Sequence, residues 1–388
     1  MPKINPDIQS FARIKVIGIG GSGGNALNHM ISEKVGGVEF IVMNTDTQDL
    51  HKSKADKKIH LGKNLTKGLG AGMNPEVGRK AADETKSEIQ DVIKGSDMVF
   101  IACGMGGGTG TGAAPIVARA AKEQGILTVA VTTRPFFFEG QARQKISLSG
   151  IKELEKEVDA IITVPNDRLL SITDEDTTFD NAFAMSDEVL RQAVEGISDL
   201  ITTPGKINVD FADIKAIMSD AGSALMGIGY ASGDGRAEKA ALEAINSPLL
   251  EVSITGAKGV LFAVSGGADL GIQEVNKAAK IITENIDKDA KVIFGTIRDD
   301  KLKKGEIKVT VIATGFPENA PKKSIFSTQV QAETNREKEV EAPLPEELKE
   351  VEERKPEKAP IPDNIVDDEE DDDDEDWNAI PAFLRRKK

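Results

Sequence analysis

Cysteine is almost absent from this sequence, and long apolar runs are missing altogether. Cys103 is the one cysteine in 388 residues, so no disulfide can form within the chain, which favours a reducing compartment. No apolar run approaches the roughly 18 residues that a membrane-spanning helix needs. The N-terminal stretch also lacks the apolar segment of a signal peptide. We therefore expect a cytoplasmic protein without a transmembrane segment.

Basic residues are also too few to balance the acidic ones. The formal net charge is −15, which argues against nucleic acid as the main partner. The imbalance is concentrated after Phe316, where 22 acidic residues stand against 12 basic ones. This segment has few apolar residues, so it cannot bury enough surface to offset the entropy of ordering. We expect a disordered acidic linker over 317–376 and an apolar, then basic, partner-binding peptide over 377–388. The other interpretation of this last segment is a solvated chain end.

Apolar strands alternate with helical patterns in the first part of the chain. The strands are predicted at 14–21, 38–46, 97–103, 126–133 and 160–166. Such alternation predicts an α/β domain over about 12–178, with a Rossmann-like parallel sheet covered by helices on both faces.

A long helical pattern follows at about 179–201, with Val189, Val194 and Ile197 at helical spacing. Residues 223–315 then read as strand, helix, two strands, helix and two strands. We predict a central linking helix over 179–202 and, over 203–316, a smaller α+β domain with a mixed sheet.

Two glycine-rich runs stand where a predicted strand ends and a helix begins. They are GIGGSGGN (18–25) and GMGGGTGTG (104–112). Without Cβ atoms, successive backbone N–H groups can converge on an anion, and the N-terminus of the following helix adds a partial positive charge. Ligands of such sheets bind at the carboxyl ends of the strands. The runs therefore predict a phosphate site, to which the hydroxyls of Thr109 and Thr111 can contribute.

The first run taken alone leaves two interpretations open. Gly18, Gly20 and Gly23 have the spacing of a dinucleotide fingerprint, and Asp46 lies where an acid holds a ribose, which favours an NAD-dependent enzyme. A tight strand–helix turn is the other interpretation. The second run lacks the Lys-Ser or Lys-Thr pair of the common NTPase phosphate loop. An NAD enzyme has no obvious use for a second cradle, so the two runs together favour a triphosphate.

The run GGGTGTG (106–112) resembles the signature loop of the tubulin/FtsZ superfamily of GTPases. Other stretches are similar to the bacterial FtsZ family: GLGAGMNPEVG (68–78), TRPFFFEG (133–140), VPNDRLL (164–170), NVDFAD (208–213), GSALMGIG (222–229) and, in the tail, IPAFLR (380–385). The resemblance covers about residues 12–316 and the last few residues. It implies a GTP-binding domain at 12–178, an activation domain at 203–316, and a GTPase that polymerises head to tail into the cytokinetic ring.

The resemblance also implies which residues bind GTP or GDP. Those near the phosphates would be Gly20, Gly21, Asn25, Ala71, Gly72, Gly104, Gly106, Gly107, Gly108, Thr109 and Gly110. Mg²⁺ is expected to bridge the phosphates, as in phosphoryl transfer generally.

The ribose and a phosphate would be reached by Glu139 and Arg143, and the guanine by Asn166, Phe183 and Asp187. On pattern alone, the first pair is typical of a surface ion pair, and the i, i+4 pair Phe183 and Asp187 of a core Phe beside a surface Asp. A carboxylate is nevertheless a double acceptor that suits the two parallel donors on the edge of guanine.

The segment NVDFAD (208–213) would carry the hydrolytic residues. Asp210 and Asp213 are spaced i, i+3, which by itself is typical of a helix N-cap followed by a first-turn acid. In the family this loop belongs to the neighbouring subunit and orients the attacking water, so Asn208, Asp210 and Asp213 would complete the site of another copy. An ordinary carboxylate is a weak base at pH 7, so we expect it to position water. The alternative is a scaffold that binds GTP without hydrolysing it. The presence of Asp210 and Asp213 argues against this alternative.

The expected partners are further copies of the chain and, through the tail, membrane-tethering divisome adaptors such as FtsA. The resemblance places Ile380, Pro381, Phe383, Leu384 and Arg385 in that adaptor contact. It also implies a location at the midcell division site beneath the membrane.

Three residues depart from the family pattern. Met73 and Phe137 are bulkier than usual near the nucleotide, which bears on its exchange, and Ala379 replaces an acidic residue in the tail peptide.

Overall fold

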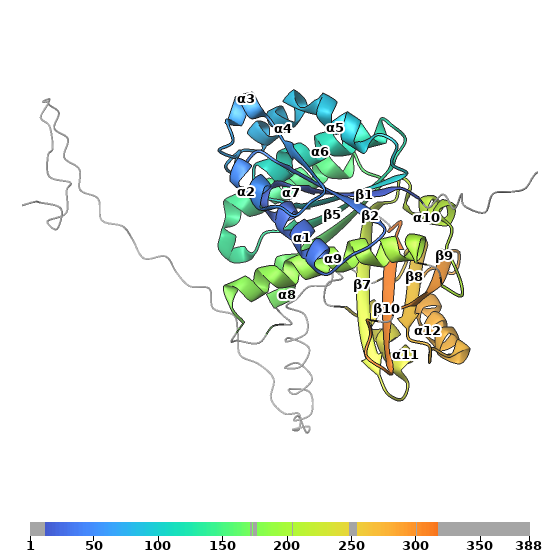
Figure 1. Ribbon diagram of the computed structural model, residues 1–388. Helices are drawn as coiled ribbons and strands as arrows, with labels where there is room; N and C mark the ends of the chain where they lie inside the picture. Colours follow the sequence, from blue (N-terminus) through green and yellow to red (C-terminus); the bar gives the residue numbers. More distant parts are fainter. Residues whose placement is uncertain are drawn as a thin grey trace, which may run out of the picture. The chain divides into compact units, whose positions relative to one another are not determined.

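The computed structural model describes residues 12–170, 173, 177–203, 205–247, 254–299 and 301–316 (Figure 1). Its strands are β1 (Ile14–Ile19), β2 (Val38–Asn44), β3 (Lys57–His60), β4 (Met98–Gly104), β5 (Leu127–Arg134), β6 (Ala160–Pro165), β7 (Gly222–Ser232), β8 (Gly259–Gly266), β9 (Lys291–Arg298) and β10 (Glu306–Thr314). Its helices are α1 (Gly20–Ser32), α2 (Thr47–Lys52), α3 (Lys63–Thr66), α4 (Pro75–Glu84), α5 (Lys86–Ile93), α6 (Thr109–Lys122), η1 (Phe137–Glu139), α7 (Gln141–Glu155), α8 (Asn166–Leu170), α9 (Phe179–Thr202), α10 (Phe211–Met218), α11 (Arg236–Ile245) and α12 (Ile272–Glu284).

The strands form one sheet in the order β3-β2-β1-β4-β5-β6-β7-β10-β8-β9. From β3 to β7 every pairing is parallel. β10 lies antiparallel between β7 and β8, and β9 is parallel to β8. The predicted α/β fold, with a parallel sheet followed by a mixed one, is confirmed. The two sheets are continuous, however, because Ala160, Ile161 and Ile162 of β6 pair with the start of β7.

Helices cover both faces of the parallel strands because the side chains of each strand alternate between the faces. In β4, Met98, Phe100 and Ala102 pack in a core with α1, α9 and α10. Val99, Ile101 and Cys103 point to the opposite core, under α4 to α7. All six side chains are fully buried. The carboxyl end of each strand is thereby held at one edge of the sheet, where both glycine runs begin.

The long helix α9 connects the two parts of the sheet (Figure 1). The side chain of Thr178 caps it by accepting a hydrogen bond from the Asn181 N–H. Its buried face includes Val189, Val194 and Ile197, as the helical spacing predicts. The same core also holds Leu261 and Ile312 of the later strands, while α11 and α12 cover their other face. Among the described residues, no helix is both long and apolar enough to cross a membrane.

Between α11 and α12 the sequence predicts two strands, and the described residues contain one, β8; residues 248–253 lie outside the described part. The acidic linker at 317–376 and the tail peptide with Ile380, Pro381, Phe383, Leu384 and Arg385 lie outside it as well.

Candidate nucleotide-binding site

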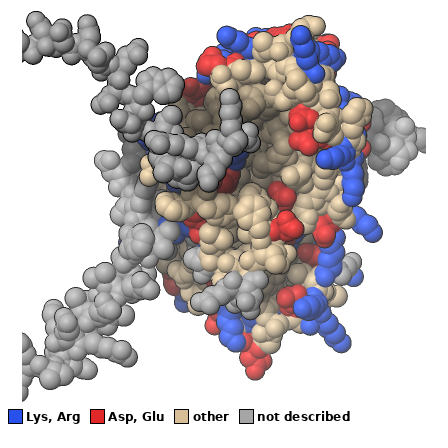
Figure 2. Space-filling view, turned by 90° about the vertical axis from the view of Figure 1, so that its left-hand side faces the viewer, with Lys and Arg blue, Asp and Glu red and all other residues tan. Residues whose placement is uncertain are grey.

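A pocket of about 680 Å³ lies at the carboxyl edge of the parallel strands. The residues that line it come from the ends of β1, β2, β4 and β5, from the turn at 70–73, and from α1, α2, α6, η1, α7, α8 and α9. Figure 2 shows the side of the molecule near the start of α9, where the surface is hollowed and Lys and Arg gather towards the margin. The residues predicted to bind the nucleotide meet around this pocket, namely Gly20, Gly21, Asn25, Ala71, Gly72, Gly104, Gly107, Gly108, Thr109, Gly110, Glu139, Arg143, Asn166, Phe183 and Asp187.

The two glycine runs meet at Gly20 and Gly110. Gly20 has φ +73° and begins α1; a Cβ on it would lie 3.1 Å from the backbone nitrogen of Gly110 in α6. The N-termini of both helices therefore converge on the same pocket, which concentrates free N–H groups and partial positive charge there. The first run also contains glycines that serve packing: a Cβ on Gly23 would lie 2.3 Å from the Ala102 carbonyl oxygen.

The turn at 70–73 closes a further side of the pocket. Gly70 and Gly72 both have positive φ, and a Cβ on Gly108 would lie 2.3 Å from the Gly72 carbonyl oxygen. The helix after this turn, α4, packs closely against the start of α6, because a Cβ on Gly78 would lie 2.3 Å from the Gly108 carbonyl oxygen. Three segments distant in the sequence thus surround one small volume.

The two threonines of the second run have different surroundings. The hydroxyl of Thr109 lies in the pocket lining, 2.6 Å from the hydroxyl of Thr45 at the end of β2. Thr111 Oγ1 instead accepts a hydrogen bond from the Gly106 N–H at 2.9 Å. Gly106 is accordingly the one predicted nucleotide contact that does not line the pocket, and its N–H is already bonded within the loop.

Glu139 and Arg143 form an ion pair across the start of α7. Glu139 Oε2 accepts from Arg143, and its Oε1 accepts from the Phe136 N–H at 2.9 Å. Both side chains are therefore fixed at the pocket by partners within the chain. The ion pair that the i, i+4 spacing predicts is therefore present, and both of its residues also line the pocket.

The opposite end of the pocket is aromatic and acidic. Phe183 is 37% exposed and lies edge-on to the buried Phe136, with 5.1 Å between the ring centroids. Burial raises the pKa of Asp187 to about 6, and the nearby His29 opposes this effect. Asn166, 4% exposed, accepts a hydrogen bond at Oδ1 from Ser186 Oγ at 2.9 Å. An apolar ring, a carboxylate and an amide at one end suit a flat base with several polar edge atoms.

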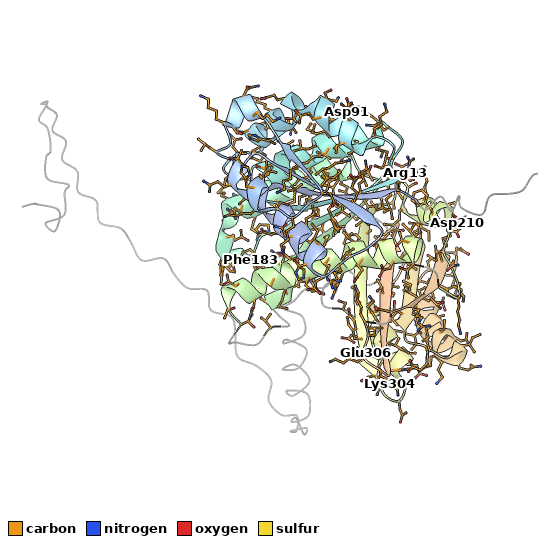
Figure 3. The ribbon with its side chains drawn as sticks, viewed as in Figure 1. Arg13, Asp91, Phe183, Asp210, Lys304 and Glu306 are labelled. Atoms are coloured by element: carbon orange, nitrogen blue, oxygen red, sulfur yellow. The ribbon has the colours of Figure 1, made fainter. Side chains whose placement is uncertain are left out.

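The residues predicted to hydrolyse the nucleotide lie elsewhere. Asp210 caps α10 by accepting from the Ala212 N–H at 3.2 Å, and Asp213 lies in the first turn of that helix. Asn208 Oδ1 accepts from the Gly205 N–H at 2.7 Å. Figure 3 shows Phe183 and Asp210 on opposite sides of the molecule. Phe183 and Thr202 lie nineteen positions apart on α9, which is about 28 Å at 1.5 Å per residue.

Several lining residues were not predicted from the sequence, among them Asn44, Thr45, Asp49 and Ser186. Thr45 follows directly on β2, so the rule that ligands bind at strand ends could have found it. Ser186 gives no such signal, because a single small polar residue within a helical segment is common and does not indicate a site.

The fold and the pocket together define a nucleotide-binding α/β protein with two glycine cradles. The chain matches the tubulin/FtsZ family GTPase domain over residues 13–174 and the FtsZ family C-terminal domain over 222–317. The solved structure of an FtsZ dimer from M. jannaschii is 44% identical, with a TM-score of 0.76 over 79% of this chain and 89% of that one. CetZ2 of Haloferax volcanii, solved as a GTPγS-bound protofilament, shares the fold at 20% identity, with a TM-score of 0.68 over 84% of this chain and 99% of that one.

From the two matching domains and the 44% identity, the chain belongs to the FtsZ family of tubulin-like GTPases. The GTPase domain of this family implies that the chain binds a guanine nucleotide. Membership of this GTPase family sets aside the NAD interpretation of the first glycine run. The carboxylate of Asp46 caps α2 by accepting from the N–H groups of Gln48 and Asp49.

Proposed function

We propose that this chain is an assembly-dependent GTPase, in which the pocket of one copy is completed by the NVDFAD loop of the next copy. The observation that carries the proposal is the separation of Phe183 and Asp210 on opposite sides of one chain. Because Asn208, Asp210 and Asp213 are all exposed, they are free to approach a second subunit. A contact between two different faces is heterologous and does not close, so it generates filaments.

In this proposal the two ends of the pocket hold different parts of GTP. The guanine lies at Asn166, Phe183 and Asp187, with the carboxylate accepting from its two edge donors. The ribose lies near Glu139 and Arg143. The triphosphate lies between the N-termini of α1 and α6, where the glycine N–H groups donate to its oxygens.

The charge of the pocket fits a divalent cation beside the phosphates. Its lining contains four carboxylates, Asp46, Asp49, Glu139 and Asp187, but only one cationic side chain, Arg143, which is already paired with Glu139. Mg²⁺ takes oxygen ligands and is usually held through phosphates and one or two carboxylates. Asp46, Asp49 and the hydroxyl of Thr109 are the oxygen groups available to it here, and it would neutralise charge on the phosphates.

Hydrolysis then requires an incoming water in line with the terminal phosphate. We assign to Asp210 and Asp213 of the adjoining copy the orientation and polarisation of this water, and to Asn208 the shape of the loop, since its side chain accepts from Gly205. Loss of the terminal phosphate would weaken the contact. This links turnover to filament assembly.

The same proposal includes a role in bacterial cell division. Head-to-tail filaments would form the cytokinetic ring in the cytoplasm at midcell, and the tail peptide at 377–388 would tether them to the membrane through adaptors such as FtsA. The FtsZ dimer of the 44% identical relative supports self-association.

The proposal is tested by GTP turnover per subunit over a range of protein concentrations, with light scattering recorded in parallel. Turnover should appear above a threshold and rise with scattering. Asp210→Asn should lose turnover and keep GTP binding, because Asn also caps helices well. Turnover independent of concentration, or a fully active Asp210→Asn protein, would mean that each subunit has a complete site. GTP binding without turnover at any concentration would favour the scaffold.

A further inference from the structure

Ser186 lies at the base end of the pocket without an assigned role. It precedes Asp187 on α9, is 4% exposed, and lines the pocket. Its hydroxyl donates to Asn166 Oδ1 at 2.9 Å. Asn166 begins α8 at the end of β6 and is itself 4% exposed, so this hydrogen bond is buried and links two separate elements at the point where the base would lie.

In this hydrogen bond the Ser186 hydroxyl is the donor, so the oxygen end of the Asn166 amide is occupied and the nitrogen end is available to a ligand. An asparagine amide presents an acceptor oxygen at one end and two N–H donors at the other, and a 180° turn exchanges them within nearly the same shape. With Oδ1 held by Ser186, the Nδ2 end is left for another partner. Within the described part of the chain, no protein acceptor is hydrogen-bonded to Nδ2, and Nδ2 is not a buried unsatisfied atom. Nδ2 is therefore not sealed from solvent, and Asn166 lines the pocket.

Donors and acceptors at this end of the pocket then form a fixed set. Asp187 contributes acceptors and Asn166 contributes donors. Guanine carries N–H donors together with acceptor atoms such as O6, whereas adenine carries an amino donor at the position of O6. A turned amide would face the base with its oxygen, which would match the amino group of adenine and place a partial negative charge beside the carboxylate of Asp187.

We propose that Ser186 is a positioning residue for base specificity: its hydroxyl holds the Asn166 amide with Nδ2 towards the base, so that guanine is accepted and adenine refused. The inference rests on the proposed binding of guanine at this end of the pocket. It predicts that the loss of one buried hydroxyl changes the choice of base, and not only the affinity.

Ser186→Ala tests the inference through the dissociation constants of GDP and ADP, measured by competition with a fluorescent guanine nucleotide. GDP binding should weaken by about three- to tenfold, the usual effect of losing one hydrogen bond, while ADP binding stays equal or improves. The ratio of the two constants therefore shifts towards ADP. Ser198→Ala is the matched control, because Ser198 is also buried on α9 but donates within its own helix, to the Glu195 carbonyl oxygen at 3.2 Å.

A double-mutant cycle with Asn166→Ala separates positioning from a general effect on the pocket. In the Asn166→Ala background, Ser186→Ala should leave the ratio of GDP to ADP binding unchanged. The inference is overturned if Ser186→Ala keeps the full preference of the natural chain for GDP, or weakens both nucleotides equally. If the natural chain itself bound ADP as tightly as GDP, the proposed guanine recognition would fail first, and the inference with it.

Discussion

Gly112 in α6 lies directly against Pro75 at the start of α4, where a Cβ on Gly112 would lie only 2.0 Å from the Pro75 carbonyl oxygen. Real side chains do not tolerate such a distance, so α4 and α6 pack at this separation only because residue 112 is glycine. The contact holds the turn at 70–73 beside the second glycine run. Backbone packing therefore shapes the side of the pocket formed by the second glycine run.

Gly107→Ala should impair nucleotide binding without unfolding the protein. Gly107 lines the pocket, and a Cβ on it would meet no protein atom within 4 Å. The added methyl group would thus occupy space that the phosphates need. We expect GDP affinity to fall by about tenfold or more, and the melting temperature of the nucleotide-free protein to change by no more than about 2 °C.

Gly112→Ala provides the contrasting variant for that experiment. Its methyl group would collide with the backbone of α4, so the nucleotide-free protein should lose roughly 1–3 kcal/mol of stability or fail to fold. If Gly107→Ala bound GDP like the natural chain, the phosphates could not lie at the second glycine run.

Asp187→Asn should stabilise the nucleotide-free protein and abolish selective guanine binding. Burial raises the pKa of Asp187 to about 6, whereas an unfolded Asp titrates near 3.9. The ionised carboxylate therefore destabilises the folded state at neutral pH, and this destabilisation disappears as the pH falls below about 4. Allowing for partial exposure, we expect Asn to add about 1–2 kcal/mol at pH 7.5 and little at pH 4.

Thermal melting across this pH range, with and without GDP, checks the prediction. Asp180→Asn is the control, because Asp180 lies on the same helix but is exposed. A stabilisation of Asp187→Asn that does not vary with pH would show that the carboxylate is not the cause. Retained GDP selectivity would show that Asp187 does not bind the base.

The elements that the sequence predicted well are those with a local cause. The existence of β1 and β4 and the helix from Phe179 follow from apolar periodicity, and the glycine runs indicate where the backbone adopts unusual geometry. The strand predicted at 14–21 in fact ends at Ile19, because α1 begins at Gly20. The pairing of β6 with β7 was not foreseeable in this way, because it depends on segments about 60 residues apart. The same holds for Ser186 and Thr45, whose roles come from Asn166 and Thr109, which the fold brings opposite them.

Cys103 should be labelled by thiol reagents only when the fold opens, and GDP should slow that labelling. The residue is fully buried on β4, and burial raises its pKa to about 12, so the reactive thiolate is scarce in the native state. A ligand that binds only the folded protein reduces the open fraction by a factor of about 1 + [L]/Kd. At 100 times Kd, labelling should therefore slow by about 100-fold.

The rate is followed with a chromogenic disulfide reagent, and the single cysteine makes the signal unambiguous. Equal rates with and without GDP would indicate an opening around β4 that does not disturb the nucleotide. The exposure of Cys103 would then not be coupled to nucleotide binding at the site that Gly110 helps to form.

Two inactive variants should restore turnover to each other when they are mixed. Asp210→Asn keeps an intact pocket but lacks the loop carboxylate, whereas Asp187→Asn keeps the loop but lacks the base contact. In a head-to-tail chain, an intact pocket can meet an intact loop from the other variant, at up to about a quarter of the contacts in an equal mixture. Turnover by the mixture should therefore exceed the sum of the separate proteins and increase with total concentration. A mixture no more active than its components would mean that Asp210 acts on the nucleotide of its own subunit, or not at all, and would remove the basis for a shared site.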